Sequence, residues 1–412
     1  MLYHHCNRAY DVAASEAAED AKVKMKRLIA TGRQSGQAMI QHVMSKVPQD
    51  AIVKAKAMNF EGAAGGLAVK AGDERWTLHG HALRQLAERA GVPAKYLADL
   101  STSQDVWQRD LAAHMLREHY HHDDDRYLVR AVDGEIRGFL SDTYRRLDTR
   151  PILASFIEAC QALELVCVEG TVTDTRVAIK AVLPLIFEPV PYEVMLFGVQ
   201  LKNSDFGAGR LELTPFLLRL WCTNKACLEN ALAQIHLGKR LPENIRFAEE
   251  TYQADTQAQA LAVRDVMTSV LSPEAIEETQ ALIIAANEQG VDWRGVSRRL
   301  ESMLGKAGVE KVRDVYANDR DVDHLPTAAA GGKEGELNLW RLTNAISWVS
   351  NSIEDGDQRM DLERLAGEML LKAKDRRDAI VERRRAAVGA DLVDEIISRR
   401  EGEAGGEQAL QA

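Results

Sequence analysis

The chain has 412 residues, of which 46% are hydrophobic, and a formal net charge of −10. A chain of this length can bury a large core and is expected to form two or three structural units. It contains no apolar run of about 18 residues, so we expect no membrane span. The N-terminus lacks the basic-then-apolar order of a secretion signal, and the odd number of cysteines, five, fits a reducing cytoplasm.

The acidic balance argues against a protein that coats nucleic acid by bulk attraction. The charge is uneven, however. Residues 126–246 contain 15 Lys and Arg and 14 Asp and Glu, a net charge of +1, and the other residues carry −11. The sequence therefore leaves room for a local basic face on this central segment.

The first 125 residues are predicted to be helical, as an N-terminal segment over residues 1–56 and a lead-in over residues 57–125. From Ser15 to Ala30, apolar residues recur at helical spacing with charged residues between them. Gly32 is the expected end of this helix, because glycine commonly follows the last helical residue.

Two further helices are expected within the lead-in. Apolar residues from Leu78 to Ala87 are spaced as on one helix face, Gly91 and Pro93 end that helix, and residues 94–100 form a second, short one. Helix-turn-helix DNA readers also join two short helices by a tight turn. We favour an ordinary helix break, because the second helix is too short to read a DNA groove well.

Residues 126–246 are predicted to form a central sheet unit. Two short apolar runs flank Asp133-Gly134, the strongest short hairpin signal in the chain. A helix over residues 151–163 follows, and then two strands around residues 170–174. Because the later strands are joined by short connections, we expect an antiparallel sheet.

Residues 195–238 complete this unit with two more strands and a helix that is expected to begin at residues 223–225. A helix N-terminus carries free backbone N–H groups, so this point and the turn at residues 203–205 are candidates for binding an anion. The predicted fold class is α+β, a central antiparallel sheet with packed helices, flanked by N- and C-terminal helical regions.

The last third of the chain is predicted to be mainly helical. Ser272 and Pro273 are typical of a helix start and Gly290 of a helix end. A stripe of apolar residues from Leu337 to Val349 predicts another helix. The predicted divisions are a helical region over 247–321, a flexible loop over 322–337, charged helices over 338–400 and a disordered tail over 401–412.

No catalytic motif is visible. The run from His119 to Asp125 contains atoms that bind metals, but its spacing is poor, so we favour a solvated loop over a metal-dependent enzyme centred there. Cys222 and Cys227 lack a second cysteine pair, and no zinc site is expected. There is no Walker phosphate loop, no G-x-S-x-G and no dinucleotide-binding fingerprint. We therefore predict no catalytic residue, no metal and no cofactor.

Side chains of the central unit form a candidate nucleic-acid-binding set. Single-strand binding combines cationic side chains that follow the phosphates with aromatic platforms for the bases, for which Tyr144 and Phe206 are available. The predicted contacts are Arg137, Tyr144, Arg145, Arg146, Lys202, Asn203, Arg210, Arg219, Asn224 and Lys225.

The alternative interpretation of this set is structural. In it, the adjacent Arg145 and Arg146 pair with the nearby aspartates Asp142 and Asp148. The basic residues of the later strands, at positions 202 and 210, then only solvate strand ends.

Several short segments, taken in order, resemble a known family. They are Ser141-Asp142 with Tyr144, Asn203-Ser204 with Gly207, Cys222-Thr223-Asn224, and Trp340 with Asn344-Ala345. The ordered set resembles the phage- and plasmid-related proteins catalogued as domain-of-unknown-function family nine-three-two. The resemblance extends over about residues 76–352 and implies a bacterial mobile-element protein of the cytoplasm, without a known chemistry.

Two functions compete on these grounds. The first is a nucleic-acid-binding protein, with annealing of single-stranded DNA in recombination or replication as its specific form and a homo-oligomer as its assembly. The order of hairpin and helices is loosely similar to that of single-strand annealing recombinases, which is a fold-level analogy. The second is a non-catalytic protein that binds or inhibits a host or phage protein, which the acidic flanks favour because acidic surface imitates the charge of DNA.

Overall fold

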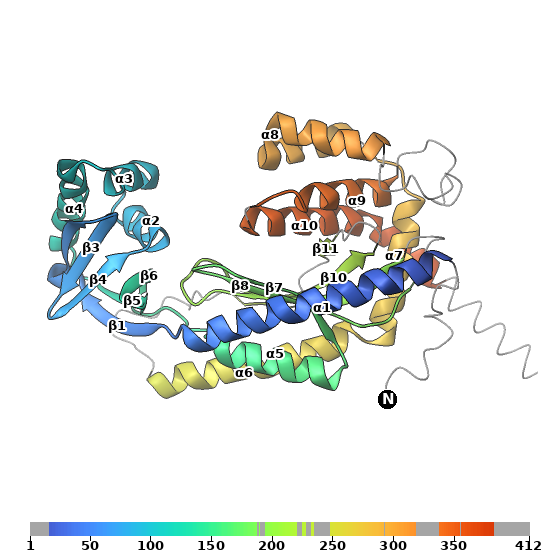
Figure 1. The fold of residues 1–412 in the computed structure, drawn as a ribbon, viewed down its shortest axis with the longest axis horizontal. Coiled ribbons are helices and arrows are strands. Elements are labelled where there is room, and N and C mark those ends of the chain that lie inside the picture. Colours follow the sequence, from blue (N-terminus) through green and yellow to red (C-terminus); the bar gives the residue numbers. More distant parts are fainter. Residues whose placement is uncertain are drawn as a thin grey trace, which may run out of the picture.

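The chain folds into a small lobe and a large lobe, which lie at the left and right of Figure 1. The structure is a computed structural model. It describes residues 16–187, 189, 194–220, 225–227, 232–234, 248–291, 293–318, 338–354 and 356–382. None of the described helices combines the length and the apolar character that crossing a membrane requires.

The small lobe is a six-stranded sheet covered on one face by three helices. Its strands run in the order β1-β5-β6-β4-β3-β2, and all described pairs are antiparallel except β4 with β6. The elements are β1 (Gln49–Lys54), the short 3-10 helix η1 (Ala55–Ala57), β2 (Asn59–Ala63), β3 (Gly66–Ala71), β4 (Glu74–Leu78), α2 (Gly80–Arg89), α3 (Ala94–Ser101), α4 (Val106–His121), β5 (Arg126–Val132) and β6 (Glu135–Ser141).

The strands β1–β4 correct the prediction that residues 1–56 and 57–125 are helical. Each of these strands has only five or six residues. The 3-10 helix η1 connects β1 to β2, and turns at Gly65 (φ 79°) and Gly72 (φ 63°) connect β2 to β3 and β3 to β4. Segments this short and this rich in glycine carry little periodic signal. The helices α2 and α3 were predicted correctly, including the break at Gly91, which has φ 66°.

The Asp133-Gly134 hairpin is confirmed. Asp133 has φ 52° and Gly134 has φ 79°, and positive φ at both central residues is the mark of the type I′ turn that suits a two-residue hairpin. The hairpin belongs to the sheet of the small lobe, however, so the predicted unit over residues 126–246 is divided between two sheets. The sequence did not show this division, because β5 pairs with β1, and three strands and three α-helices lie between the two in the chain.

The large lobe is a second sheet between helices. The long strands β7–β10 are antiparallel neighbours, as predicted, and the short β11 and β12 both pair with β10. Its elements are α1 (Glu16–Ser45), α5 (Thr149–Ala162), β7 (Val166–Val172), β8 (Val177–Val182), β9 (Met195–Asn203), β10 (Leu211–Arg219), β11 (Lys225–Cys227), β12 (Leu232–Gln234), α6 (Glu249–Val270), α7 (Pro273–Asn287), α8 (Trp293–Asn318), α9 (Leu339–Ser350), α10 (Gly356–Leu370) and the 3-10 helix η4 (Leu371–Ala373).

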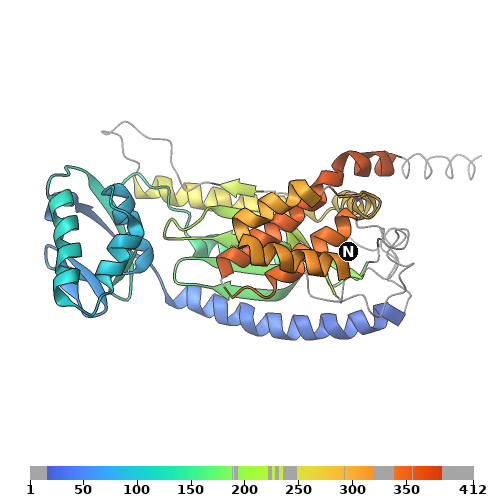
Figure 2. The same ribbon diagram turned by 90° about the horizontal axis from the view of Figure 1, so that it is seen from above.

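The helices α5 and α6 cover one face of this sheet, and α9 and α10 cover the other (Figure 1). Figure 2 shows α1 along one edge, beside β7. The fold class is therefore α+β, as predicted. The helix expected to begin at residues 223–225 is wrong, because Lys225 lies in strand β11 opposite Leu218. Thr223 and Asn224 lie outside the described residues.

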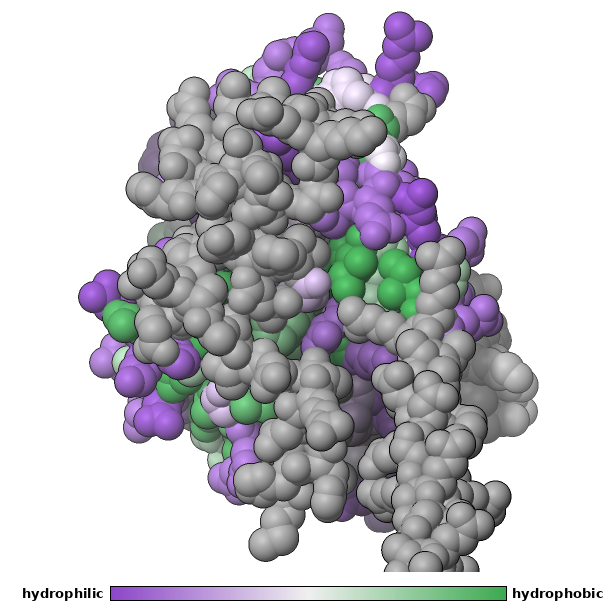
Figure 3. Space-filling view, turned by 90° about the vertical axis from the view of Figure 1, so that its right-hand side faces the viewer, coloured by the Kyte–Doolittle hydropathy of each residue, from purple (hydrophilic) through white to green (hydrophobic). Residues whose placement is uncertain are grey.

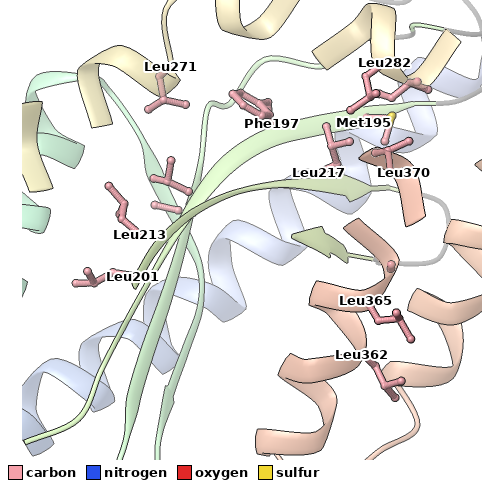
Figure 4. Packing of buried hydrophobic residues seen from close by; sticks show 14 of the residues in the cluster. Met195, Phe197, Leu201, Leu213, Leu217, Leu271, Leu282, Leu362, Leu365 and Leu370 are labelled. Atoms are coloured by element: carbon pink, nitrogen blue, oxygen red, sulfur yellow. The ribbon is translucent and has the colours of Figure 1, made fainter. Parts of the chain in front are cut away.

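Among its described residues, the large lobe has a large apolar cluster that extends across its layers and a smaller one beside α1. Residues of β9 and β10 that point to one face belong to the larger cluster together with Leu271 and Leu282, and Figure 4 shows Leu362 and Leu365 of α10 on the other side of the sheet. The side chains labelled there are Met195, Phe197, Leu201, Leu213, Leu217, Leu271, Leu282, Leu362, Leu365 and Leu370. Figure 3 looks onto the end of this lobe opposite the small lobe, where apolar residues gather between hydrophilic ones.

The C-terminal helices follow their predicted signals. The Ser272 side chain caps α7 by accepting from Ala275 N, and Asn338 caps α9 by accepting from Arg341 N. The helix α8 is interrupted at Gly305, which has φ 67°. The predicted loop over 322–337 and the tail over 401–412 lie outside the described residues, as does the predicted charged helix beyond residue 382.

The helix α1 does not end at Gly32 as predicted but continues to Ser45. The glycines serve packing instead. A Cβ on Gly32 would lie 2.3 Å from the backbone of Val168 in β7, and one on Gly170 would lie 2.6 Å from Gly36 Cα. The missing side chains therefore let the α1 and β7 backbones approach closely.

We predict that Gly32→Ala destabilises the protein by about 1–3 kcal/mol, because the added methyl group has to push α1 away from β7. Gly80→Ala in α2 is the matched control, since a Cβ there meets nothing within 4 Å. Urea unfolding of both variants measures the difference. Equal stability of the two would show that α1 does not depend on this close approach.

Candidate functional site

The two lobes meet at a buried arginine of β5. The Arg130 side chain is only 3% exposed. Its Nε donates to Asp50 Oδ1 at 2.8 Å, and its Nη2 donates to Asp148 Oδ1 at 2.7 Å. Its Nη1 donates to the backbone carbonyl of Asp205 at 2.9 Å. Burial alone would lower the pKa of Arg130, but the carboxylates of Asp148 and Asp50 raise it above its ordinary value, so the side chain stays charged.

The small lobe also holds the loop between β9 and β10. The Phe206 carbonyl accepts from Gln85 Nε2 at 3.1 Å and lies 3.1 Å from His81 Nε2. A Cβ on Gly138 of β6 would lie 3.2 Å from Phe206 Cα and O. Burial lowers the pKa of His81, which keeps the ring neutral beside Arg84. The loop is therefore fixed by the small lobe although it connects two strands of the large lobe.

The residues 203–205 that were predicted to bind an anion instead hold the start of α5. Asp205 accepts from Thr149 N at 2.8 Å and from Thr149 Oγ1 at 2.7 Å. Asn203 is 2% exposed, and its Nδ2 donates to Leu147 O at 2.7 Å. Burial raises the pKa of the Asp205 carboxyl, and the Thr149 hydrogen bonds oppose that shift. These side chains face the protein interior, which corrects their assignment to a surface contact.

Most of the predicted phosphate-binding arginines have carboxylate partners. Arg145 forms a two-pronged pair with Asp255 of α6, and Arg137 donates to Glu135 at 3.2 Å. Arg146 Nε lies 3.4 Å from Asp50. Arg145 and Arg146 are therefore paired with carboxylates, as the structural interpretation expected, and the partners Asp255 and Asp50 lie far from them in sequence.

Other residues of the predicted nucleic-acid-binding set are buried or lie outside the described residues. Tyr144 and Phe206 are both 7% exposed, so neither presents an open ring for stacking. Arg219 is 2% exposed. Asn224 lies outside the described residues, and only the backbone placement of Lys225 is described.

A row of polar residues, buried apart from the half-buried Glu169, crosses the sheet face under α10. The strand registers place Glu169 beside Lys180, Lys180 beside Gln200, and Gln200 beside Thr214. Lys180 Nζ donates to Glu363 Oε2 of α10 at 2.7 Å and to its Oε1 at 3.0 Å. Since a charge this deep must be paired, the Lys180–Glu363 contact sets where α10 sits on the sheet.

A cationic pocket lies next to this row, between the sheet and the first turns of α10. It encloses 190 Å³ at the start of β8, the end of β9 and the start of β10. Its lining residues are Arg176, Val177, Lys202, Asn203, Gly209, Arg210, Glu212, Met360, Asp361 and Arg364. Four cationic and two acidic side chains give this lining a net charge of +2.

Lys202 is the most available cation of this pocket. Arg210 donates to Glu212 at 2.5 Å and Arg364 to Asp361 at 3.1 Å. The Lys202 ammonium makes no ion pair with any of the described residues. The strand register places Lys202 beside Glu212, which already pairs with Arg210. The pocket thus has the composition expected of a site for an anionic group.

The sequence pointed to Lys202 and Arg210 but missed Arg176 and Arg364. Arg176 follows the tight turn between β7 and β8, where a basic residue is unremarkable. Arg364 reaches the pocket only because α10, far along the chain, returns over the sheet. No local signal connects these positions.

The run from His119 to Asp125 shows structural contacts. Tyr127 donates its hydroxyl to Asp123 at 2.7 Å, and Lys56 pairs with Asp124 at 2.5 Å. Among the described residues, no three His, Cys, Asp or Glu side chains are grouped so that they could hold a metal ion. The structure therefore gives the metal-dependent enzyme no support at this run.

Comparisons with models of protein families, with curated proteins and with solved structures found no match for this chain.

We predict that Arg130→Met destabilises the protein by about 3 kcal/mol, because it removes the buried charge that donates to both Asp50 and Asp148, and Arg146, 3.4 Å from Asp50, does not replace both hydrogen bonds. Arg75→Met is the control, since its pair with Glu61 is exposed and should contribute less than about 0.5 kcal/mol. Chemical denaturation followed by circular dichroism measures both. A loss below about 1 kcal/mol for Arg130→Met would contradict the role given to this cluster.

Proposed function

We propose that this protein binds nucleic acid, and that the cationic pocket beside α10 holds phosphate groups of a single strand. The observation that carries the proposal is the convergence of Arg176, Lys202, Arg210 and Arg364 on one pocket of 190 Å³ in an acidic protein. Phosphate oxygens accept hydrogen bonds from both guanidinium and ammonium groups. The unpaired Lys202 could engage a phosphate without first losing a carboxylate partner.

The overall acidity does not oppose this proposal. A net charge of −10 weakens attraction at long range, and salt at physiological strength screens it beyond about 8 Å. At contact distance, the local +2 of the pocket lining decides the sign of the interaction. Binding of this kind is expected to be weak on double strands and confined to segments flexible enough to enter the pocket.

The resemblance to mobile-element proteins suggests where such binding is used. We propose a cytoplasmic role in recombination or replication of a phage or plasmid, with annealing of single-stranded DNA by a homo-oligomer as its specific form. Measuring the mass of the protein with and without single-stranded DNA tests the assembly, and an unchanged monomer would exclude annealing by a ring.

We predict that Lys202→Ala weakens binding of a fluorescein-labelled oligothymidylate several-fold, because one phosphate contact is lost. The slope of log affinity against log salt should become less negative by about 0.7. Fluorescence polarisation across a salt series measures both quantities.

Lys56→Ala is the matched control for this experiment, because it removes the same charge from the small lobe, where Lys56 pairs with Asp124. It should leave both affinity and slope unchanged. No binding of the wild-type protein at low salt would refute the proposed function, and equal losses in the two variants would refute the assignment to the pocket.

The second candidate function is binding to a host or phage protein. One observation favours it: Tyr96 of α3 and Val106 and Trp107 of α4 expose 50%, 61% and 63% of their surface on the small lobe. Exposed aromatic residues are enriched in protein interfaces.

We predict for this candidate that the wild-type protein captures a partner from nuclease-treated host lysate and that Trp107→Ala loses it. Lys202→Ala, as the matched control, should retain the same partner, because its change lies in the large lobe. Mass spectrometry of the captured proteins identifies the difference. Loss of capture after nuclease treatment would instead assign the interaction to nucleic acid.

A further inference from the structure

A second pocket lies where α5 and α6 begin, on the sheet face opposite α10. It encloses 230 Å³. The two helices run side by side below the sheet in Figure 1. The lining residues are Arg146, Asp148, Pro151, Tyr252, Gln253, Thr256 and Gln257. This volume is below the roughly 300–1,000 Å³ of pockets for drug-sized ligands, so it suits a single ring system.

The Arg146–Tyr252 wall of this pocket consists of two flat groups, one lying over the other. The Arg146 guanidinium carbon lies 5.4 Å from the centre of the Tyr252 ring. The backbone of Arg146 is held in place, because Thr256 Oγ1 donates to its carbonyl at 2.8 Å. Its Nε also lies 3.4 Å from Asp50. Aromatic rings and guanidinium planes are the two side-chain surfaces on which nucleobases stack.

Two amide side chains stand beside this wall. Gln253 and Gln257 are one helical turn apart on α6, so they project from the same side of the helix. Both are exposed, and neither side chain has a hydrogen-bond partner within the part of the chain that the structure describes. An amide offers a donor and an acceptor together, which matches the polar edge of any base. The carboxylate of Asp148 adds an acceptor for an exocyclic amino group.

We propose that this pocket is a nucleobase subsite, which stacks one base on the Arg146–Tyr252 wall and meets its edge with Gln253 and Gln257. The inference rests on the proposed function, because the base belongs to the strand that the protein binds. In this subsite, the Tyr252 ring takes the role of the aromatic platform that was predicted for Tyr144 and Phe206, both of which are buried. Since an amide can hydrogen-bond to any base, we expect the subsite to bind all bases and to discriminate little between them.

A short series of contacts connects the two pockets. Asn203 lines the cationic pocket, and its Nδ2 donates to Thr149 Oγ1 at 3.0 Å. Thr149 follows Asp148, which lines the base pocket. The start of α5 therefore lies between the two sites, which are on opposite faces of the sheet.

The test compares two labelled strands of equal length, an oligothymidylate and an abasic deoxyribose-phosphate strand, by fluorescence polarisation at one salt concentration. Wild-type protein should bind the oligothymidylate more tightly. Tyr252→Ala should weaken that binding at least about fivefold and leave binding of the abasic strand unchanged, because stacking is lost and the phosphate contacts remain. Gln253→Ala should act in the same direction with a smaller effect.

Tyr252→Phe keeps the ring and should bind like the wild-type protein, which controls for damage to folding. Equal binding of the two strands by the wild-type protein would overturn the base subsite while leaving the phosphate site standing. An equal loss on both strands in Tyr252→Ala, or no loss, would also overturn it. No binding of either strand would instead remove the proposed function itself.

Discussion

The arrangement of this protein depends on the charge of one buried side chain, Arg130. Its three donor groups are shared among β1, the residue that precedes α5 and the loop that joins β9 to β10. These segments are far apart in sequence and belong to both lobes. A guanidinium is suited to this task because it stays charged and presents its donors in a rigid plane. A hydrophobic contact of the same size would not define the angle between the lobes as closely, because it lacks direction.

The same loop faces both the small lobe and the cationic pocket. On one side Phe206 is held by His81 and Gln85 of α2, and on the other Gly209 and Arg210 line the pocket. The loop therefore links the small lobe to the pocket, and the buried contacts of Asn203 and Asp205 with the start of α5 hold it in place.

Local patterns in the sequence predicted local structure well and predicted contacts between distant segments poorly. The Asp133-Gly134 turn and the Ser272 cap were visible because turn and cap chemistry depends on neighbouring residues. Gly32 was misread as a helix end, since its reason for being glycine lies on β7. For the candidate site, the residue types at positions 202 and 210 were informative. Whether these two cations are free to bind an anion could not be predicted, because this depends on the acidic residues that other elements place beside them.

This difference explains why Arg145 and Lys202, which look alike as candidates in the sequence, differ as binding residues. Arg145 faces Asp255 on α6, so binding a phosphate would require breaking a two-pronged pair that is partly shielded from water. Lys202 projects from a sheet face on which the neighbouring acid already pairs with Arg210. The free energy of binding depends on what a cation gives up as well as on what it gains. In an acidic protein, a cation that has no carboxylate partner is therefore a stronger indication of an anion site than a cluster of arginines in the sequence.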